Sequence, residues 1–407
     1  MLDNFGKISR NEKEMLEPAK KLPVKVLVLF GTRPEAIKLA PVIFELKRRD
    51  LQTVVVSSSQ HTELLAPFLW IFNLEIDYDL RVMRENQTPT EVCARILSAF
   101  DRILETENPD IVLVQGDTAT AFTGALAAFN RKIKIGHVEA GLRSGNIKSP
   151  FPEEMNRRLI SQIADFHFAA TSANKKNLLA ENVEESKIFV CGNTVVDALQ
   201  FIQKNLKPSV RIKNLICETE NLKRILLTTH RRESFGAAMS ENLNVLRRFV
   251  KKETDVCLIF PVHPNPNVRK TTNKILANRE RIFLLEPLDY IDFVYLMKNV
   301  WLIVSDSGGV QEEAPSLGKP VFILRENTER PEAIEAGTAK LVGENSLEKM
   351  LETNYNDTTW INSVRAIANP FGDGKAAKKI VKVLENKFCA PDRSEKISYK
   401  LPQIITK

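Results

Sequence analysis

The sequence predicts an α/β protein built from two doubly wound, parallel-sheet domains that face a central cleft. Short apolar strand patterns alternate with helical patterns along most of the 407 residues, which is typical of parallel strands joined by crossover helices. This alternation forms two series, and the chain is longer than one ordinary core organises. In proteins of this kind, ligands bind beyond the carboxyl ends of the strands. We therefore look for the site at strand ends.

Six strands are predicted in each half of the chain. In the first half they cover residues 24–30, 53–58, 110–115, 134–138, 166–170 and 188–191. In the second half they cover residues 224–229, 256–261, 282–285, 302–305, 320–324 and 339–342. Residues 192–220 are interpreted as the connection, because the helical pattern after GNTVVDAL fades into Lys, Pro and Asn. A final helix over about 374–387 is predicted to precede a tail of residues 388–407, and residues 1–23 form an N-terminal extension.

The charge of the chain does not indicate nucleic-acid binding. The net charge is +7, but residues 1–25 and 387–407 together supply +5 of it. No basic stripe with interleaved aromatic residues appears between these ends, so we expect no nucleic-acid partner.

The cysteine usage and the apolar runs predict a cytoplasmic protein. Five scattered cysteines contain no C-x-x-C spacing, which is typical of reduced thiols. The first 23 residues lack the apolar region of a secretory signal. No run approaches the length of a membrane span, so no membrane insertion is expected.

Ionisable residues follow the predicted strands repeatedly. They are Arg33 and Lys38 after the first strand, Asp117 after the third, Glu139 and Arg143 after the fourth, Glu153 and Glu154 at the start of a later helix, and His230 and His263 in the second half. Because parallel strands end at one edge of their sheet, we expect these side chains to converge on one cleft.

Several of these residues also have a structural explanation. Glu153 is favoured at a helix start by the helix dipole alone, and Asp117 can cap the next helix. His263 lies next to a proline and can simply satisfy backbone groups, and His61 and His167 are interpreted as structural or surface residues. The repeated coincidence of strand ends with ionisable groups favours a functional site.

Residues 301–332 predict a site for a nucleoside diphosphate. A buried strand, a polar turn, a helix and a second buried strand bring a helix N-terminus to the sheet edge, where anions bind. Gly308 and Gly309 allow a phosphate to approach the backbone. Glu312 and Glu313 follow one turn later and suit ribose hydroxyls, although they can also be surface charges of the helix. The pattern is not a P-loop.

Together these motifs resemble those of the non-hydrolysing UDP-N-acetylglucosamine 2-epimerases. The resemblance rests, in chain order, on GTRPEAIKLAP, QGDT, HVEAGLRS, PEEMNRR, GNTVVDAL, THRRES, PVHPNPNV, SDSGGVQEEAPSLGKP and TERPE, and it spans about residues 25–387. It implies a GT-B fold with Rossmann-like domains over 24–192 and 193–369, and a final helix, about 370–387, that packs back on the first domain. It also implies a homodimer that interconverts UDP-N-acetylglucosamine and UDP-N-acetylmannosamine.

The resemblance also assigns roles to residues of this chain. The implied catalytic residues are Asp117, Glu139, Glu153 and His230, with His230 contacting the leaving diphosphate. The predicted substrate-binding residues are Arg33, Lys38, Arg143, Leu288, Phe293, Ser307, Gly308, Gly309, Glu313 and Arg330. Among these, Glu313 is expected on the ribose and Phe293 against the uracil. The sequence leaves open which carboxylate serves which face of C2.

The chemistry of C2 explains why a site of this composition is needed. The hydrogen on C2 is not next to a carbonyl, so a base alone would hardly remove it. The chain has no G-x-G-x-x-G after a strand, so an NAD route lacks its site, and neither a cofactor nor a metal is predicted. Elimination of UDP and its re-addition need cations for the diphosphate and carboxylates for the proton.

One departure from the family pattern concerns a second substrate site. Bacterial members can bind an activating UDP-N-acetylglucosamine with residues of a QHR-x-ML and a D-R-Q-T segment. Gln60 and His263 remain as possible second-site residues, but Thr62 and Asn86 stand where the pattern has arginine. We therefore expect substrate activation to be weak or absent, or the sugar to differ.

Four alternative functions stay open from the sequence. A GT-B glycosyltransferase would share the fold and nucleotide site but would not need three carboxylates at these strand ends. A hydrolysing 2-epimerase would release free N-acetylmannosamine, against which the GTRPEAIK opening argues. An epimerase of UDP-2,3-diacetamido-glucuronic acid would show the same motifs, since the sequence does not identify the residues that contact C3 and C6 of the sugar. A nucleotide-sugar-binding regulator with a dead site would not need to retain the catalytic residues.

Overall fold

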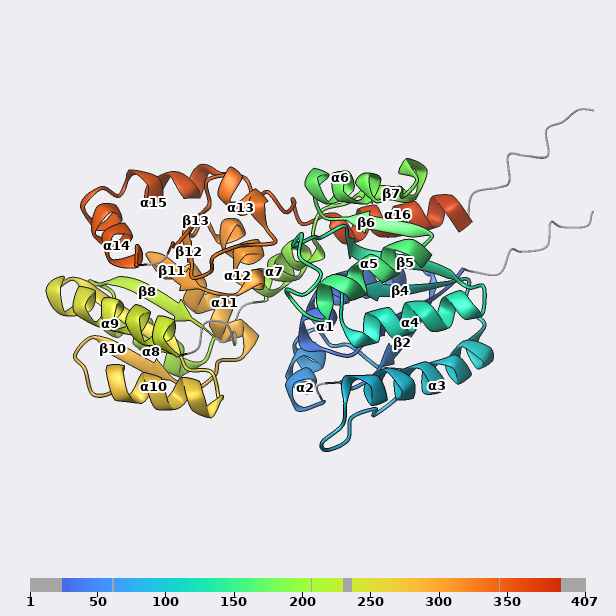
Figure 1. The fold of residues 1–407 in the computed structure, drawn as a ribbon, viewed down its shortest axis with the longest axis horizontal. Helices are drawn as coiled ribbons and strands as arrows, with labels where there is room; N and C mark the ends of the chain where they lie inside the picture. The colour runs from blue at the N-terminus through green and yellow to red at the C-terminus, as the bar shows by residue number, and fades with distance from the viewer. Residues whose placement is uncertain (1–23, 61, 206, 230–235, 344, 389–407) are drawn as a thin grey trace, which may run out of the picture.

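A computed structural model describes residues 24–60, 62–205, 207–229, 236–343 and 345–388, which form two α/β domains side by side (Figure 1). Each domain has a central parallel sheet covered by helices on both faces, as the alternating pattern predicted. The N-terminal extension 1–23 and the tail 389–407 lie outside the described residues.

The first sheet has seven parallel strands in the order β3-β2-β1-β4-β5-β6-β7. These strands are β1 (Lys25–Phe30), β2 (Gln52–Ser57), β3 (Tyr78–Asp79), β4 (Ile111–Gln115), β5 (Lys134–Ala140), β6 (Phe166–Ala169) and β7 (Ile188–Val190). The helices between them are α1 (Arg33–Arg48), α2 (Thr62–Ile71), α3 (Pro89–Glu107), α4 (Ala119–Asn130), α5 (Glu153–Ile163) and α6 (Ser172–Ala180). The short strand β3 escaped prediction because two residues carry no periodic signal.

The second sheet has six parallel strands in the order β10-β9-β8-β11-β12-β13. These strands are β8 (Lys223–Thr228), β9 (Val256–Pro261), β10 (Ile282–Leu285), β11 (Leu302–Ser305), β12 (Val321–Ile323) and β13 (Ala339–Leu341). Its helices are α8 (Val210–Glu218), α9 (Ala237–Lys252), α10 (Pro266–Leu276), α11 (Tyr290–Lys298), α12 (Gly308–Glu313), α13 (Pro331–Glu335), α14 (Leu347–Asn356) and α15 (Thr359–Ser363).

Alternating strand residues separate the core of each domain into two layers. In β1, Val26 and Val28 face α1, whereas Leu27 and Leu29 join Phe100 of α3 and the alanines of α4. This is the period of two expected for a strand buried on both faces. The layer on the α1 side continues into the second domain through buried residues of α11, so the two domains share one apolar core on that side.

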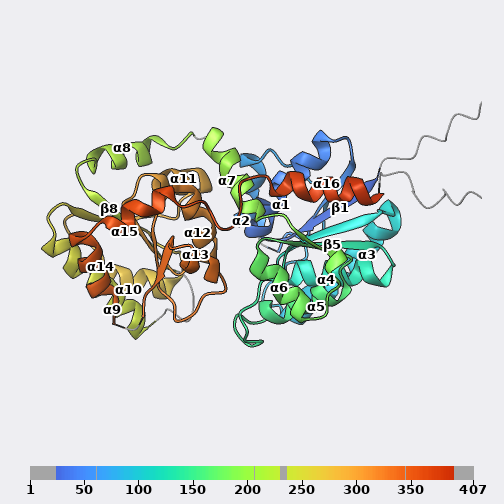
Figure 2. The same ribbon diagram turned by 90° about the horizontal axis from the view of Figure 1, so that it is seen from above.

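Two segments connect the domains at the waist of the molecule. Helix α7 (Thr194–Lys204) packs against α1, α11 and α12, and the final helix α16 (Ala376–Phe388) lies beside α1 and α7 (Figure 2). The two segments that cross between the domains meet at a hydrogen bond of 2.7 Å, in which the Asn193 N–H donates to the Phe371 carbonyl. The carboxylate of Asp197 then accepts the backbone N–H groups of Ala376 and Ala377 at the start of α16. The C-terminal helix is thus anchored on the first domain.

The connection predicted over 192–220 contains more structure than its composition indicated. Helical structure does not end with α7, because α8 forms after it in the chain. Ser209 caps α8 by accepting the Ile212 N–H, and its own hydroxyl donates to Asp292 of α11. A cap and two buried apolar residues therefore hold a helix in a stretch of weak periodicity.

Among the residues that the structure describes, no helix combines the length and apolar character needed to cross a membrane.

Candidate active site

The loop after β1 is fixed by a buried carboxylate. Glu35 Oε2 accepts the N–H groups of Gly31 and Thr32 at 3.0 and 2.8 Å, and Glu35 Oε1 accepts the Thr118 hydroxyl at 2.6 Å. Burial raises the pKa of Glu35 to about 6 despite these hydrogen bonds. The motif GTRPE therefore sets the start of α1, and it ties this loop to the one that carries Asp117.

Lys38, one turn into α1, lies between carboxylates of both domains. Its Nζ is 2.5 Å from Glu139 Oε1, at the end of β5, and 3.0 Å from Glu312 Oε2, on α12. Burial disfavours the ammonium, but the two carboxylates more than offset this and raise the pKa of Lys38. Lys38 therefore stays charged where the two sheets' carboxyl ends meet.

Glu139 is held by more than its ion pair. The residue has φ +66°, and the pairing of β5 with β6 shifts register at this point. Its side chain accepts the amide of Gln115 at one oxygen and that of Asn193, 3.1 Å away, at the other. A left-handed conformation costs energy at a non-glycine residue, and for Glu139 its surroundings hold it in place. The sequence predicted the strand to end at Val138, whereas the structure continues it through Glu139 to Ala140.

Arg330 extends the charged cluster into the second domain. Its Nε lies 2.7 Å from Glu312 Oε1 and its Nη1 lies 2.6 Å from Glu329 Oε1. The guanidinium rests against Gly308, where an added Cβ would be only 2.4 Å from Arg330 Nη1. Gly308 therefore makes room for the Arg330 guanidinium, and its contact with a phosphate stays a prediction. A Cβ on Gly309 would meet only Ser307 Oγ at 3.9 Å.

Glu313 forms a second carboxylate position on α12. Its Oε1 accepts the Tyr290 hydroxyl at 2.7 Å. Burial raises the pKa of Glu313 to about 7, against the effect of this hydrogen bond. The Tyr290 ring packs 5.7 Å from that of Phe68, and the Arg33 guanidinium lies 5.5 Å above Phe68. Through Phe68, the Arg33 guanidinium of the first domain is thereby brought towards Tyr290 of α11 in the second domain.

Asp117 lies in the loop after β4, and Glu153 begins α5, whose Asn156 and Arg157 contact Asp117. Asp117 Oδ2 accepts Arg157 Nη2 of α5 at 2.5 Å, and a Cβ on the preceding Gly116 would lie 3.7 Å from Glu139 Oε2. Arg157 also binds the fully buried Glu154. Glu153, the first residue of α5, is half-buried, and its side chain has no hydrogen bond or ion pair to any described residue.

Other predicted residues are placed away from the charged cluster. Arg143 turns to Glu181, with contacts of 2.8 and 2.6 Å, and to Ser161 Oγ at 3.0 Å. This ion pair accounts for Arg143 without a substrate, so its binding role stays a prediction. Gln60 accepts the Thr120 hydroxyl at 3.0 Å, and the exposed His263 accepts the Asn265 N–H. His230 lies outside the described residues.

The predicted uracil pocket is partly occupied by the core. Leu288 and Phe293 are half-buried and pack against the shared apolar cluster beside Tyr290. Phe293 follows Asp289, which caps α11 by accepting the Asp292 N–H. Their contact with a base stays a prediction.

Buried histidines of the first domain are structural, as expected for His167. Burial lowers the pKa of His167 to about 4 and that of His137 to about 3, so both are neutral. His137 Nε2 lies 2.7 Å from the carbonyl of Gly116 and supports the loop before Asp117. Neither side chain is a general acid at neutral pH.

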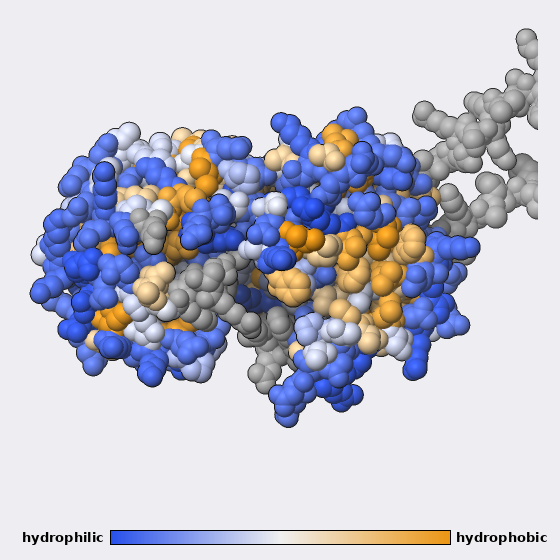
Figure 3. Space-filling model, viewed as in Figure 1, coloured by the Kyte–Doolittle hydropathy of each residue, from blue (hydrophilic) through white to orange (hydrophobic). Residues whose placement is uncertain are grey.

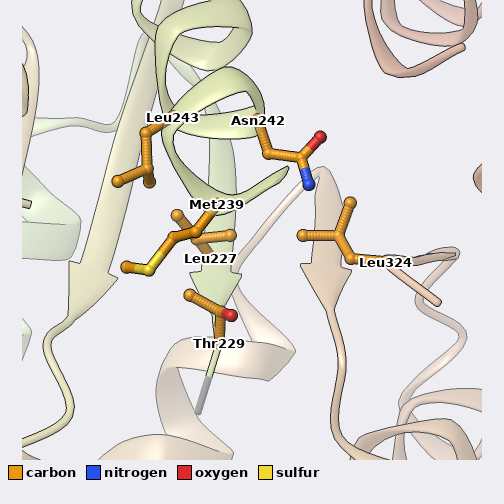
Figure 4. A pocket seen from close by; sticks show the side chains of 6 residues that line it. All are labelled: Leu227, Thr229, Met239, Asn242, Leu243 and Leu324. Carbon is orange, nitrogen blue, oxygen red and sulfur yellow. The ribbon is translucent and has the colours of Figure 1, made fainter. Parts of the chain in front are cut away.

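A small cavity near the end of β8 does not account for a substrate site. Its volume is about 10 Å³, and Figure 4 shows mostly apolar side chains around it. The lining residues are Leu227, Thr229, Met239, Asn242, Leu243 and Leu324. A space of this size holds about one water molecule.

Sequence reasoning missed three features of the site. Glu312 was expected on the ribose or the surface, but it is buried and bridges Lys38 and Arg330. Tyr290 and Asn193 were not predicted to contact carboxylates. Asn193 lies two residues after the predicted strand 188–191, and this position is the signal that could have found it.

Comparison with known proteins places these residues in a family. A sequence profile described as UDP-N-acetylglucosamine 2-epimerase matches residues 45–385. A Yersinia pestis UDP-N-acetylglucosamine 2-epimerase is 45% identical over 373 residues, covering 89% of this chain and 99% of that protein.

Two solved structures share the fold. The Neisseria meningitidis UDP-GlcNAc 2-epimerase bound to UDP-GlcNAc has a TM-score of 0.83 and 45% identity, covering 89% of this chain and 99% of that one. An S. aureus protein, MnaA, in a co-structure with UDP has a TM-score of 0.83 and 41% identity, covering 89% of this chain and 96% of that one. The predicted GT-B-like architecture is confirmed by these likenesses. The chain therefore belongs to the UDP-N-acetylglucosamine 2-epimerase family.

Proposed function

We propose that this chain catalyses the reversible epimerisation of UDP-N-acetylglucosamine at C2 to give UDP-N-acetylmannosamine. The observation that carries this proposal is the meeting of Lys38, Glu139 and Arg330 between the two domains, in a chain 45% identical to a protein solved with UDP-GlcNAc bound. Cations at this position suit a leaving diphosphate, and a carboxylate beside them suits proton transfer.

The proposed reaction is an elimination followed by re-addition. The bond from C1 to the diphosphate oxygen breaks, and its electron pair leaves with UDP. A carboxylate takes the proton from C2, and the electrons of that C–H bond form the C1=C2 double bond of 2-acetamidoglucal. A proton then adds to the other face of C2, and the UDP oxygen rejoins C1. No electrons are gained or lost overall, so the step requires no redox cofactor.

Each group has a proposed role. Lys38, Arg330 and Arg33 stabilise the charge that grows on the departing diphosphate. Glu139 is a candidate for one acid/base group, since it lies within reach of Lys38 and has a fixed conformation. Asp117 and Glu153 are candidates for the group at the opposite face.

The nucleotide is proposed to bind along α12 and α11. Ser307, Gly308 and Gly309 would meet the diphosphate at the start of α12. Glu313, which already accepts a hydroxyl from Tyr290, would accept the ribose hydroxyls. The base would lie at residues 288–293. The remaining assignments to His230, Arg143, Gln60 and His263 rest on the sequence resemblance alone.

Proton NMR in deuterated water tests the proposed chemistry. UDP-N-acetylglucosamine, incubated with the enzyme and no acceptor or added cofactor, should yield both epimers with deuterium at C2. Inversion without deuterium would contradict elimination through an exchangeable proton. Sugar transfer only in the presence of an acceptor would instead identify a glycosyltransferase, and release of free N-acetylmannosamine would identify a hydrolysing enzyme.

We also propose that the protein is a homodimer. Apolar side chains gather on the first domain in Figure 3, and Phe129 of α4 and Leu159 of α5 are exposed on helices that pack together. Sedimentation velocity should give a dimer that Phe129→Asp weakens. Leu179→Asp, a change of an exposed apolar residue on α6, should leave the dimer intact. A monomeric wild-type protein would contradict the proposal.

We further propose that the protein acts in the cytoplasm. Four cysteines among the described residues, Cys93, Cys191, Cys217 and Cys257, are free, which is typical of a reducing compartment. Cell fractionation with an antibody to the native chain would test this assignment.

A further inference from the structure

Six side chains of alternating charge form a continuous chain from the second domain into the first. In order they are Arg325, Glu329, Arg330, Glu312, Lys38 and Glu139. Successive charged atoms are 2.6, 2.6, 2.7, 3.0 and 2.5 Å apart. No side chain in this charge chain is more than 11% exposed. Three cations and three carboxylates balance, which is how so many charges can be buried together.

Glu312 is the link that joins the two domains within the charge chain. Its Oε1 faces Arg330 and its Oε2 faces Lys38, and its side chain is 1% exposed. The two contacts differ in kind. Arg330 Nε donates a hydrogen bond, whereas Glu312 Oε2 has an ion pair with Lys38 but no hydrogen bond from any described residue. The hydrogen bond of Lys38 goes to Glu139 instead.

Starting from the proposed function, we propose that Glu312 is a positioning residue that holds Lys38 and Arg330 together and so couples the diphosphate side of the site to the C2 side. Glu312 shares the Lys38 ammonium with Glu139 and so fixes the ammonium between the two carboxylates. It also keeps Lys38 beside Arg330, where the leaving diphosphate gains charge.

The charges that face Lys38 give this proposal a specific pH signature. Glu139 faces it from β5, Glu312 and Glu313 from α12, and Arg330 from the residue before α13. The carboxylates raise the pKa of Lys38, whereas burial and Arg330 lower it. Glu312→Gln removes one of the raising charges and keeps the shape of the side chain. The Lys38 ammonium then loses its proton at lower pH.

The decisive experiment compares Glu312→Gln with Glu329→Gln as a matched control. Both variants replace a buried carboxylate that binds Arg330, but only Glu312 contacts Lys38. In Glu312→Gln we expect kcat to fall at least tenfold and the alkaline limb of the kcat profile to move down by about one pH unit. In Glu329→Gln we expect the alkaline limb to stay at the wild-type position, whatever happens to KM.

Equilibrium binding of UDP, followed from neutral pH to above the raised pKa of Lys38, gives the same comparison without turnover. Its alkaline loss of affinity should move down in Glu312→Gln only. If the wild type binds UDP but does not epimerise, the proposed function fails while this measurement still tests the coupling. The inference would be overturned if Glu312→Gln and Glu329→Gln lost affinity for UDP at the same alkaline pH. It would also be overturned if the kcat of Glu312→Gln equalled that of the wild type.

A second variant separates the titration of Lys38 from any effect of Glu312→Gln on folding. Lys38→Arg keeps the positive charge and does not titrate below about pH 12. In this variant the Glu312→Gln substitution should no longer move the alkaline limb of UDP binding, and only the loss caused by ionisation of the uracil N3–H should remain. A limb that still moves when Glu312→Gln is added to Lys38→Arg would refute the role of Lys38 in the coupling.

Discussion

Replacement of Gly308 by alanine tests whether the buried Arg330 contact is as tight as the structure describes. The added Cβ would lie 2.4 Å from Arg330 Nη1 and 2.6 Å from its Cζ, whereas ordinary contacts begin at 3.4 Å. The guanidinium must therefore withdraw by about 1 Å. Such a shift takes the 2.7 Å contact with Glu312 beyond hydrogen-bond length.

The free energy of unfolding should fall by the amount that breaking a buried ion pair costs. Glu312 would keep its charge without its hydrogen-bonding partner, which costs about 3 kcal/mol or more. For a domain of this size, 3 kcal/mol lowers the unfolding midpoint by roughly 6 to 12 °C. Differential scanning fluorimetry measures the midpoint, and UDP titration calorimetry measures the accompanying loss of affinity.

Gly309→Ala is the matched control on the next residue of α12. Its added Cβ would meet only Ser307 Oγ at 3.9 Å, an ordinary contact. Alanine also restricts the unfolded chain, so stability should stay level or rise by about 0.5 kcal/mol. Equal midpoints for the two variants, or a stable Gly308→Ala protein, would refute the reasoning.

Three further predictions concern the nucleotide side, the domain contact and the kinetics. The pKa of Glu313 is about 7, and its carboxylate is the proposed ribose acceptor, so the affinity for UDP should fall as the pH drops below 7. Glu313→Gln should flatten this pH dependence in calorimetric titrations. A pH dependence that is unchanged in the variant would contradict the role of Glu313. Thr171→Val removes both the 2.5 Å hydrogen bond to the buried Glu332 of the other domain and the N-cap of α6, so the unfolding midpoint should fall by the equivalent of about 1–3 kcal/mol. A Thr171→Ser control should retain the midpoint. Since Thr62 and Asn86 replace two arginines of the family pattern, initial rates should saturate hyperbolically with substrate, and sigmoidal rates would count against weakened activation.

Some structural features were already contained in local sequence patterns. Strand positions were predicted to within a residue or two at most places, because a strand buried on both faces shows as a continuous apolar run. The turn at GTRPE was also legible, since a proline in the first helical turn is a local signal. β3 was missed because two residues carry no periodic signal, and α8 was missed because its cap residue Ser209 is held by Asp292 of another helix.

Residue partners within the site were harder to predict. Arg143 follows a strand and looks like a ligand for phosphate, yet Glu181 takes it in an ion pair. Glu154 and Glu153 look alike in sequence, but only Glu154 is buried against Arg157. Residues of the same type near a strand end therefore make different contacts, because different helices and loops pack over them.

By itself, the sequence determined the alternation of strands and helices, the edge of each sheet at which polar residues gather, and the family that these motifs resemble. Only the tertiary structure decided that Lys38 pairs with Glu312, 274 positions away along the chain, and that Gly308 makes room for Arg330. Periodicity and turns are properties of neighbouring residues, so they can be read along the chain. The partner of a buried charge is set by desolvation and geometry once the domains have packed, and no local pattern records it.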